Sequence, residues 1–89
     1  MESEIGALIR EYRLKAGFTQ KDLAEKLGYT QSVFVSLIEK GVSKVPLHTL
    51  GELIKILSIP EKKVTKILVD SYSQKVKLEI SLGKKKHAS

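Results

Sequence analysis

The polar side chains best suited to recognising another molecule gather at the predicted starts of two short helices. Gln20 follows Thr19 at the start of one helix, and Thr30, Gln31 and Ser32 open the next. A helix N-terminus carries unpaired N–H groups and a partial positive charge, so an amide side chain there can help to bind a phosphate. A glutamine amide can also pair with the edge of an adenine through two hydrogen bonds. Residues of these types can therefore serve as hydrogen-bonding contacts to another molecule, or only as capping residues of the two helices.

The residue types that most enzymes use are absent or isolated. The chain has no cysteine and two histidines, His48 and His87, neither of which has a second metal ligand at useful spacing. The sequence contains no Ser/His/acid arrangement and no glycine-rich phosphate loop. We therefore expect no enzyme, no metal site and no cofactor, and we expect both histidines to lie on the surface.

The positive charge of the chain is concentrated in its C-terminal third. Among 89 residues, 16 Lys and Arg oppose 10 Asp and Glu, which gives a formal net charge of +6. Residues 1–54 carry seven basic and seven acidic side chains, so the whole excess lies in residues 55–89. A positive balance attracts polyanions without choosing between nucleic acid and membrane. No apolar run approaches the roughly 20 residues of a membrane span, so we expect no membrane partner.

Apolar spacing predicts helices along most of the chain, whose length suits one small domain. The expected helices lie at about residues 3–16, 19–27, 30–40, 46–57 and 61–82. Ser3 and Thr30 are expected N-caps, and Thr19 with Asp22 forms a variant of the capping box. Glycines directly after the first two helices are typical C-terminal stops.

The segment 75–82 fits two patterns. Its alternate residues are apolar, as in a strand: Val76, Leu78, Ile80 and Leu82. Apolar residues also recur at steps of four from Leu68 through Tyr72, which continues the preceding helix. We favour a helix, because a single strand in a helical chain has nothing to pair with; a strand paired across a dimer is the alternative. Residues 83–89 are expected to form a basic disordered tail.

Two short helices joined by a tight connection, after a longer first helix, form the layout of a helix-turn-helix. The segment FTQKDLAEKLGYTQSVFVSLIEKG resembles the phage-repressor or Xre-type helix-turn-helix family of DNA-binding transcriptional regulators. The resemblance is carried by TQ-x-x-LA-x-x-LG from Thr19, IREYR at 9–13, IEKG at 38–41 and VPLHTL at 45–50. It covers about residues 5–59 and implies a DNA-binding domain at residues 1–60. With the fifth helix that the apolar spacing predicts, we expect an all-α five-helix bundle.

The chain has one residue more than the commonest family pattern before Glu39 and another after it, which leaves the register of the third helix open. If the family pattern is aligned forward from the second helix, Phe34 and Leu37 fall at its core positions. Counting backward from Glu39 places Val35 and Ile38 there instead. Because consecutive residues lie about 100° apart on a helix, one face cannot bury both sets.

We prefer the backward count because the resemblance implies a partly buried ion pair between Arg13 and Glu39. Such a pair would hold the end of the third helix against the first. Two unpaired surface charges are the alternative interpretation.

The resemblance also assigns roles to residues of the second and third helices. The expected DNA-binding residues are Thr19, Gln20, Thr30, Gln31, Ser32, Val33, Leu37, Lys40 and Lys44. Gln20 would hold a phosphate, and the two lysines suit phosphates beyond the end of the third helix. Residues 30–32, as the first turn of a recognition helix, would face base edges, although they could serve only as capping residues. Val33 and Leu37 would contact thymine methyl groups or would be buried.

The fifth helix carries more apolar surface than one helix can cover against a small bundle. We therefore expect it to form a homodimer contact through Val64, Leu68, Tyr72, Val76 and Ile80. The predicted function is that of a small repressor-like protein that binds a palindromic operator in double-stranded DNA, in the cytoplasm of a bacterium or encoded by a phage. The alternative is a protein–protein adaptor or antitoxin-like module that binds a protein partner and retains the fold.

Overall fold

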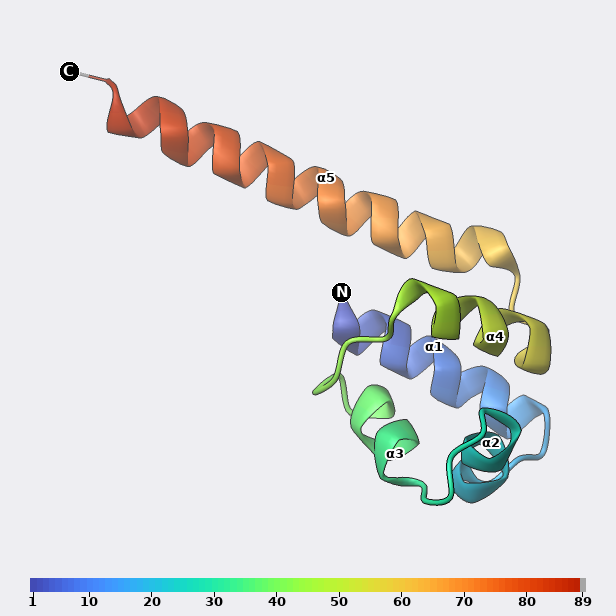
Figure 1. Ribbon diagram of the computed structural model, residues 1–89. Helices are drawn as coiled ribbons and strands as arrows, with labels where there is room; N and C mark the ends of the chain where they lie inside the picture. Colours follow the sequence, from blue (N-terminus) through green and yellow to red (C-terminus); the bar gives the residue numbers. More distant parts are fainter. Residues whose placement is uncertain (89) are drawn as a thin grey trace.

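The computed structural model describes residues 1–88, and these contain five α-helices and no strands (Figure 1). The helices are α1 (Glu2–Lys15), α2 (Gln20–Lys26), α3 (Val33–Glu39), α4 (Leu47–Leu57) and α5 (Glu61–Lys86). The first four form a small body, and α5 runs across it and projects beyond it (Figure 1). The predicted all-helical class and five-helix order are confirmed.

Local chemistry fixes the ends of the first two helices. The Asp22 N–H donates to Thr19 Oγ1 at 2.9 Å, and the Thr19 N–H donates to Asp22 Oδ2 at 2.9 Å, so the capping box is complete. Gly17 and Gly28 follow α1 and α2 with φ of 76° and 89°. That left-handed region suits glycine, and it turns the chain out of each helix.

Two predicted caps are wrong. Helix α1 begins at Glu2, with Met1 as its N-cap, so Ser3 lies inside the helix. Helix α3 begins at Val33 after Ser32, and no side chain caps it. Thr30 therefore lies in the connection between α2 and α3, where tertiary packing has overridden its preference for a capping position.

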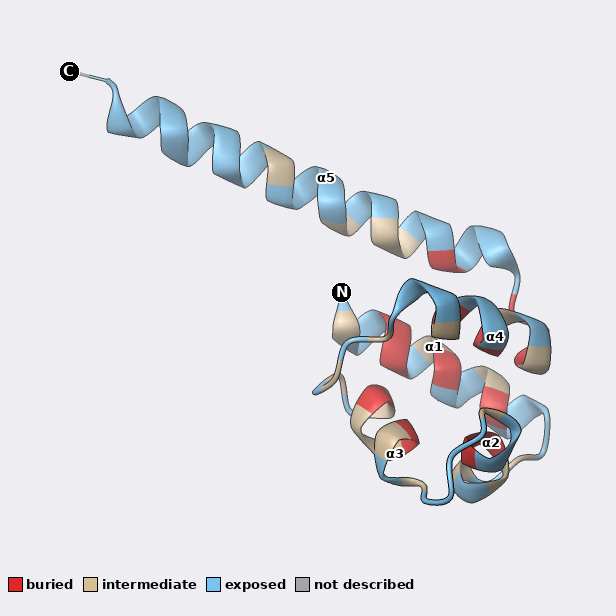
Figure 2. Ribbon diagram, in the orientation of Figure 1, coloured by how far each residue is buried: buried red, intermediate tan, exposed pale blue. Residues whose placement is uncertain are grey.

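The core of the body lies between α1, α2, α3, α4 and the start of α5 (Figure 2). The largest side chains that are essentially inaccessible to solvent are Ile9, Leu23, Val35, Ile38 and Leu53. Val35 and Ile38 come from one face of α3, whereas Phe34 and Leu37 are only half-buried. The backward count from Glu39 is therefore confirmed, and the forward count is wrong.

A glycine in α1 lets the first and third helices approach closely. A Cβ atom at Gly6 would collide with the backbone carbonyl oxygen of Ile38 at the end of α3. Glycine inside a helix costs about 0.5–1 kcal/mol relative to alanine, so its presence there is explained by packing. The contact brings the C-terminal end of α3 directly against α1.

Helix α5 is continuous from Glu61 to Lys86, so residues 75–82 are helical and the strand alternative is wrong. The expected disordered tail is also wrong for residues 83–86, which continue the helix; residue 89 lies outside the described residues. Val64 packs into the core, and Lys63 Nζ donates to the Tyr12 hydroxyl oxygen of α1 at 2.9 Å. Only the first turns of α5 are thus anchored to the body.

The projecting helix makes the molecule elongated, with principal extents of 57 × 24 × 19 Å. Over residues 1–88, no helix combines the length and the apolar character that a bilayer-spanning segment requires.

Candidate nucleic-acid interface

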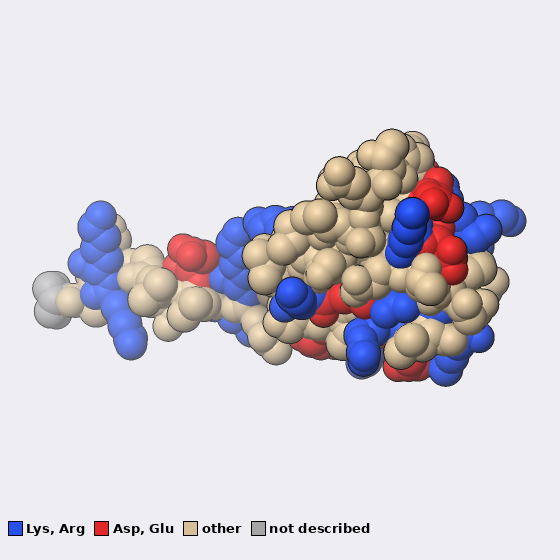
Figure 3. Space-filling view, turned by 90° about the horizontal axis from the view of Figure 1, so that it is seen from below, with Lys and Arg blue, Asp and Glu red and all other residues tan. Residues whose placement is uncertain are grey.

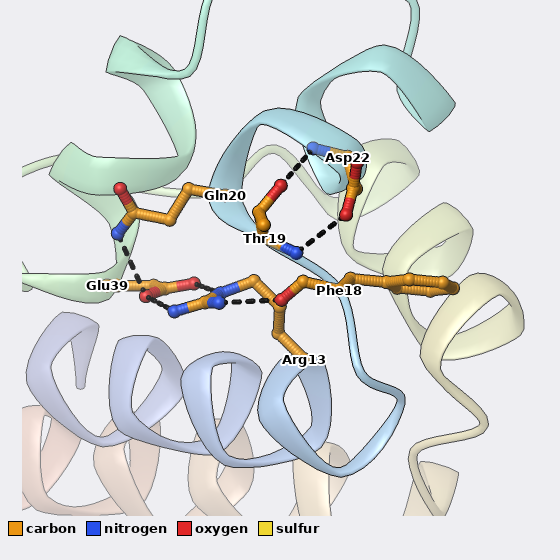
Figure 4. Close-up of polar contacts among 6 residues, drawn as sticks. All are labelled: Arg13, Phe18, Thr19, Gln20, Asp22 and Glu39. Carbon is orange, nitrogen blue, oxygen red and sulfur yellow. Dashed lines mark hydrogen bonds and ion pairs between the residues drawn. The ribbon is translucent and has the colours of Figure 1, made fainter.

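A buried ion pair joins α1 to the end of α3 (Figure 4). Arg13 Nε donates to Glu39 Oε2 at 2.6 Å, and Arg13 Nη2 donates to Glu39 Oε1 at 3.0 Å. The two side chains are 8% and 3% exposed. Arg13 Nη1 also donates to the carbonyl oxygen of Phe18 at 2.8 Å. The expected pair is therefore present, and the hydrogen bonds to Glu39 raise the pKa of the Arg13 guanidinium.

Gln20 extends this network to α2. Its Nε2 donates to Glu39 Oε1 at 3.2 Å, so the carboxylate receives hydrogen bonds from two helices (Figure 4). The side chain of Gln20 is half-buried, and its amide N–H is directed toward Glu39 in this structure. Sequence reasoning expected Gln20 to face a phosphate and missed this contact, because the contact depends on how α2 and α3 pack.

The opposite face of α3 is turned outward. Val33 is 58% exposed, whereas Val35, two positions later, is 1% exposed. Thr30 and Gln31 are exposed as well, but they precede the helix. The expectation that residues 30–32 form the first turn of this helix is wrong: they lie in the connection that leads into it.

An aromatic pair supports this outward face. The rings of Tyr29 and Phe34 lie 5.0 Å apart between centroids at 51°, a tilted arrangement that aromatic pairs favour. Beside them is an open hollow of about 340 Å³, lined by Tyr29, Thr30, Gln31, Val33, Phe34 and Leu37. Sequence reasoning missed the pair, although an aromatic residue directly after a helix-ending glycine is a usable signal.

The sequence that forms these helices matches a known family. A family model described as Helix-turn-helix matches residues 9–64. The chain belongs to this helix-turn-helix family. It is therefore a DNA-binding transcriptional regulator.

Solved structures of one controller protein are similar over most of the chain. The wild-type Restriction-Modification Controller Protein C.Esp1396I superposes with a TM-score of 0.62 and 25% identity, covering 82% of this chain and 94% of that chain. A mutant of the same controller protein superposes with a TM-score of 0.62 and 27% identity, covering 80% and 89%. No curated protein sequence matches the chain significantly.

The lysines predicted to contact DNA lie outside the hollow of this helix-turn-helix. Lys40 caps the C-terminal end of α3, and Lys44 follows in the loop to α4; both are exposed. Lys44 lines a different pocket, near the N-terminus of α1. Seen from below, the body mixes acidic and basic side chains with broad uncharged areas (Figure 3). This face of the molecule is therefore not one continuous positive surface.

Asp22 lies in the first turn of α2, where its carboxylate completes the capping box. The hydrogen bond from the Thr19 backbone N–H lowers the pKa of the Asp22 carboxyl. The carboxylate is thus kept charged at the positive end of the helix dipole. Within residues 1–88, no three potential metal ligands gather closely enough to hold an ion.

The residues expected to contact a second copy divide into two groups. Val64 is 2% exposed and belongs to the core of its own chain, so its assignment to a dimer contact is wrong. Leu68 is half-buried and lines an apolar pocket of about 360 Å³ between α1, α4 and α5. Tyr72 and Ile80 are 69% and 58% exposed, and Val76 is half-buried. These four remain accessible along α5.

Proposed function

We propose that this transcriptional regulator binds a specific palindromic operator as a homodimer, in the manner of a small repressor of a bacterial cytoplasm or a phage. The observation that carries the proposal is the orientation of α3. One face of this helix is fixed to the body by Val35, Ile38 and the ion pair of Glu39. Its other face, starting at Val33, is open to solvent beside the exposed amide of Gln31. A rigidly held helix with a free face is what reading base edges in a major groove requires.

Phosphate contacts would position this helix on the duplex. Thr19 and Gln20 stand at the start of α2, and Lys40 and Lys44 follow the end of α3, so the two groups flank the free face of α3 along the chain. Such contacts add affinity and orientation without reading sequence. Specificity is therefore assigned to the residues around the start of α3.

The exposed apolar residues of α5 support a dimer. Large side chains beyond the body are largely open to solvent: Val69, Tyr72, Leu78, Ile80 and Leu82. Leu82 lies about five helical turns after the buried Val64, so both belong to one stripe that continues past the edge of the body. Exposed apolar surface of this kind usually marks a partner site, and lysines among these residues can remain at its rim.

A second copy is the partner that best fits this surface. Two-fold dimers are the commonest oligomers, and two recognition helices are needed for a palindromic site. The apolar pocket that Leu68 lines lies next to α5, and it can receive side chains from helix α5 of the second copy. The proposed contact consists of Leu68, Tyr72, Val76, Leu78, Ile80 and Leu82.

Selection of bound sites from random DNA, with the full chain at physiological salt, tests the proposal. We expect a consensus of two inverted half-sites whose centres are about one helical turn of DNA, roughly 34 Å, or a multiple of it apart. Light scattering should give a mass twice the 9.9 kDa of the chain. A single asymmetric half-site with a monomeric protein would overturn the dimer.

The mixed charge of the body and the uncharged surface of α3 favour one alternative, a protein–protein adaptor that keeps the helix-turn-helix fold. The same selection distinguishes the two functions. DNA binding that survives only at low salt and yields no consensus would support the adaptor, because nonspecific binding depends almost entirely on phosphate contacts.

A further inference from the structure

The outer part of α5, residues 69–86, carries a second apolar stripe that is turned away from the side packed on the body. Val76 follows Val64 by 12 residues, which turns it about 120° around the helix axis from that buried side chain. Steps of three or four residues extend the second stripe on both sides of Val76, and its members are Val69, Tyr72, Val76, Ile80 and Gly83. None of the five belongs to the core of the chain, so the stripe is free to pack on another helix.

The spacing within the second stripe is the same in both directions. Its steps are three, four, four and three residues, so the stripe is symmetric about Val76. If two such helices pack antiparallel with Val76 at the two-fold axis, Tyr72 of one lies opposite Ile80 of the other. Val69 then lies opposite Gly83 of the other. A parallel pair would instead set Gly83 against Gly83 and leave a gap. The symmetry is that of an isologous contact, in which the same surface serves both copies.

Gly83 fits the antiparallel pair and is not explained by contacts within the chain. It lies inside α5, where glycine weakens a helix relative to alanine. A Cβ atom there would have no atom of residues 1–88 within 4 Å, unlike a Cβ at Gly6. In the pair, the side chain of Val69 from the second copy lies over Gly83, so the missing side chain lets the two helices approach closely.

Two charges beside the second stripe complement each other in the same pair. Lys75 and Glu79 flank the stripe on one side, and neither has an ion-pair partner among the described residues. In an antiparallel pair centred on Val76, residues on the same side of the two stripes face each other. Lys75 of one copy then lies within about 3 Å, along the axis, of the level of Glu79 of the other. The pair therefore brings together two symmetric sets of opposite charges.

We propose that two copies of α5 pack antiparallel along the second stripe, with Val76 at the two-fold axis, and that this pair sets the distance between the two DNA-binding bodies. The inference rests on the proposed function, since it gives the orientation of the second copy in the proposed dimer. Val64 lies about 18 Å along the helix from Val76, so the two points where α5 is anchored lie about 36 Å apart. Operator half-sites one DNA turn apart are separated by roughly 34–36 Å.

The same two-fold axis directs both bodies to one side of the helix pair. Helices α1 and α4 lie between α5 and α3, so α3 is on the side of the body away from α5 (Figure 1). Both α3 helices of the dimer would then face the same duplex. Leu82, on the stripe of Val64, comes within about one helical turn of the level of Leu68 of the second copy, where the apolar pocket lies.

Cysteine cross-linking of the full chain tests the register, because the chain has no cysteine of its own. Val76→Cys should form a disulfide-linked dimer on mild oxidation, since the two copies of this position meet at the axis. Tyr72→Cys and Ile80→Cys should not link when each is alone, because each lies about 12 Å along the axis from its own copy. A mixture of these two variants should link. Gln74→Cys, on the opposite side of the helix, is the matched control and should not link.

An insertion into α5 tests the spacing. Eleven added helical residues between Leu68 and Val69 leave the second stripe within about 20° of its direction and move the two bodies about 33 Å farther apart. Selection of bound sites from random DNA should then return half-sites one DNA turn farther apart than those of the wild type. An unchanged spacing, or no paired half-sites, in this variant would show that α5 does not set the distance.

The outcomes separate this inference from the function on which it rests. Self-linking of Tyr72→Cys and of Ile80→Cys would show a parallel pair, which overturns the inference and leaves the proposed function standing. A Val76→Cys protein that is dimeric by light scattering but does not link would also overturn it, because the contact then lies elsewhere. If the wild type selects no palindromic site although Val76→Cys links, the proposed function fails and the antiparallel pair stands without it.

Discussion

The body and the outer part of α5, residues 69–86, differ in whether their apolar side chains form a buried core. In the body, Ile9, Leu23 and Leu53 are at most 1% exposed, and an ion pair fixes the third helix on the first. In the outer part of α5, no described residue is buried, and Leu78 and Ile80 are each 58% exposed. Helices α1–α4 thus enclose a core within one chain while Val42 and Leu47 stay exposed, whereas the outer part of α5 encloses no core of its own.

The body and the outer part of α5 have different requirements in the proposed function. The proposed function requires a rigid body, because a recognition helix has to hold its side chains in fixed positions against base edges. The outer part of α5 leaves large apolar side chains exposed, which is the surface that the proposed second copy would cover. The predictions below test each side of this contrast, beginning with the largest expected effect.

The strongest test of the body is Glu39→Ala. Removing this carboxylate leaves the guanidinium of Arg13 buried without its partner, and Gln20 loses an acceptor. Breaking a buried pair costs about 3–5 kcal/mol of unfolding free energy, measured by urea denaturation. Glu25→Ala on the exposed face of α2 is the control and should cost less than about 0.5 kcal/mol. Equal losses would show that the ion pair does not stabilise the body.

Removal of residues 75–89 tests the other side of the contrast. Because Val64 and Leu68 remain, the body should still unfold cooperatively, but light scattering should show a monomer. Affinity for the selected palindrome should fall by about a hundredfold or more, since the two recognition helices are no longer linked. Removing only residues 87–89 should change neither property. A truncated chain that remains dimeric would place the interface on the body.

Two glycines in helices compare a packed position with an open one. Gly6→Ala should lower the unfolding free energy by about 1–3 kcal/mol, because the new methyl group meets backbone at the end of α3. Gly51→Ala in α4 meets no atom nearby and should raise it by about 0.5–1 kcal/mol. Thermal melts of the two variants measure both changes, and shifts of the same sign would contradict the close approach of α1 and α3.

The salt dependence of DNA binding tests which lysines reach phosphates. Lys40→Ala or Lys44→Ala should each reduce the slope of log K against log salt by about 0.9, the value for one lost phosphate contact. Lys77→Ala, on the outer part of α5, should leave the slope unchanged. If the slope is unaltered in either of the first two variants, that lysine lies outside the DNA interface. If it falls in Lys77→Ala, then α5 itself approaches the duplex.

The smallest expected effect concerns acid stability. Since the pKa of Asp22 is lowered in the folded protein, its contribution is present above the unfolded pKa and is lost as the pH falls through the folded pKa. Asp22→Asn should therefore be less stable than the wild type near neutral pH, and the difference should shrink below pH about 4. Denaturation at several pH values measures this, and a constant difference would mean that capping does not depend on the charge.

Sequence alone determined the features whose causes lie within a few residues. The capping box of Thr19 and Asp22 was predicted, and so were the stops at Gly17 and Gly28, because each depends on local hydrogen bonds or on one backbone angle. The Arg13–Glu39 pair was predicted from the spacing of a family motif, and it also gave the correct register of α3.

Tertiary structure decided the features that depend on what lies beside a residue. Helix α3 begins at Val33 rather than Thr30, and Gly6 is needed only because the end of α3 lies against α1. Val64 is buried within its own chain whereas Leu82, on the same stripe of α5, is 51% exposed. An apolar period shows which residues share a face of a helix, but only the position of neighbouring elements determines where along the helix that face is covered.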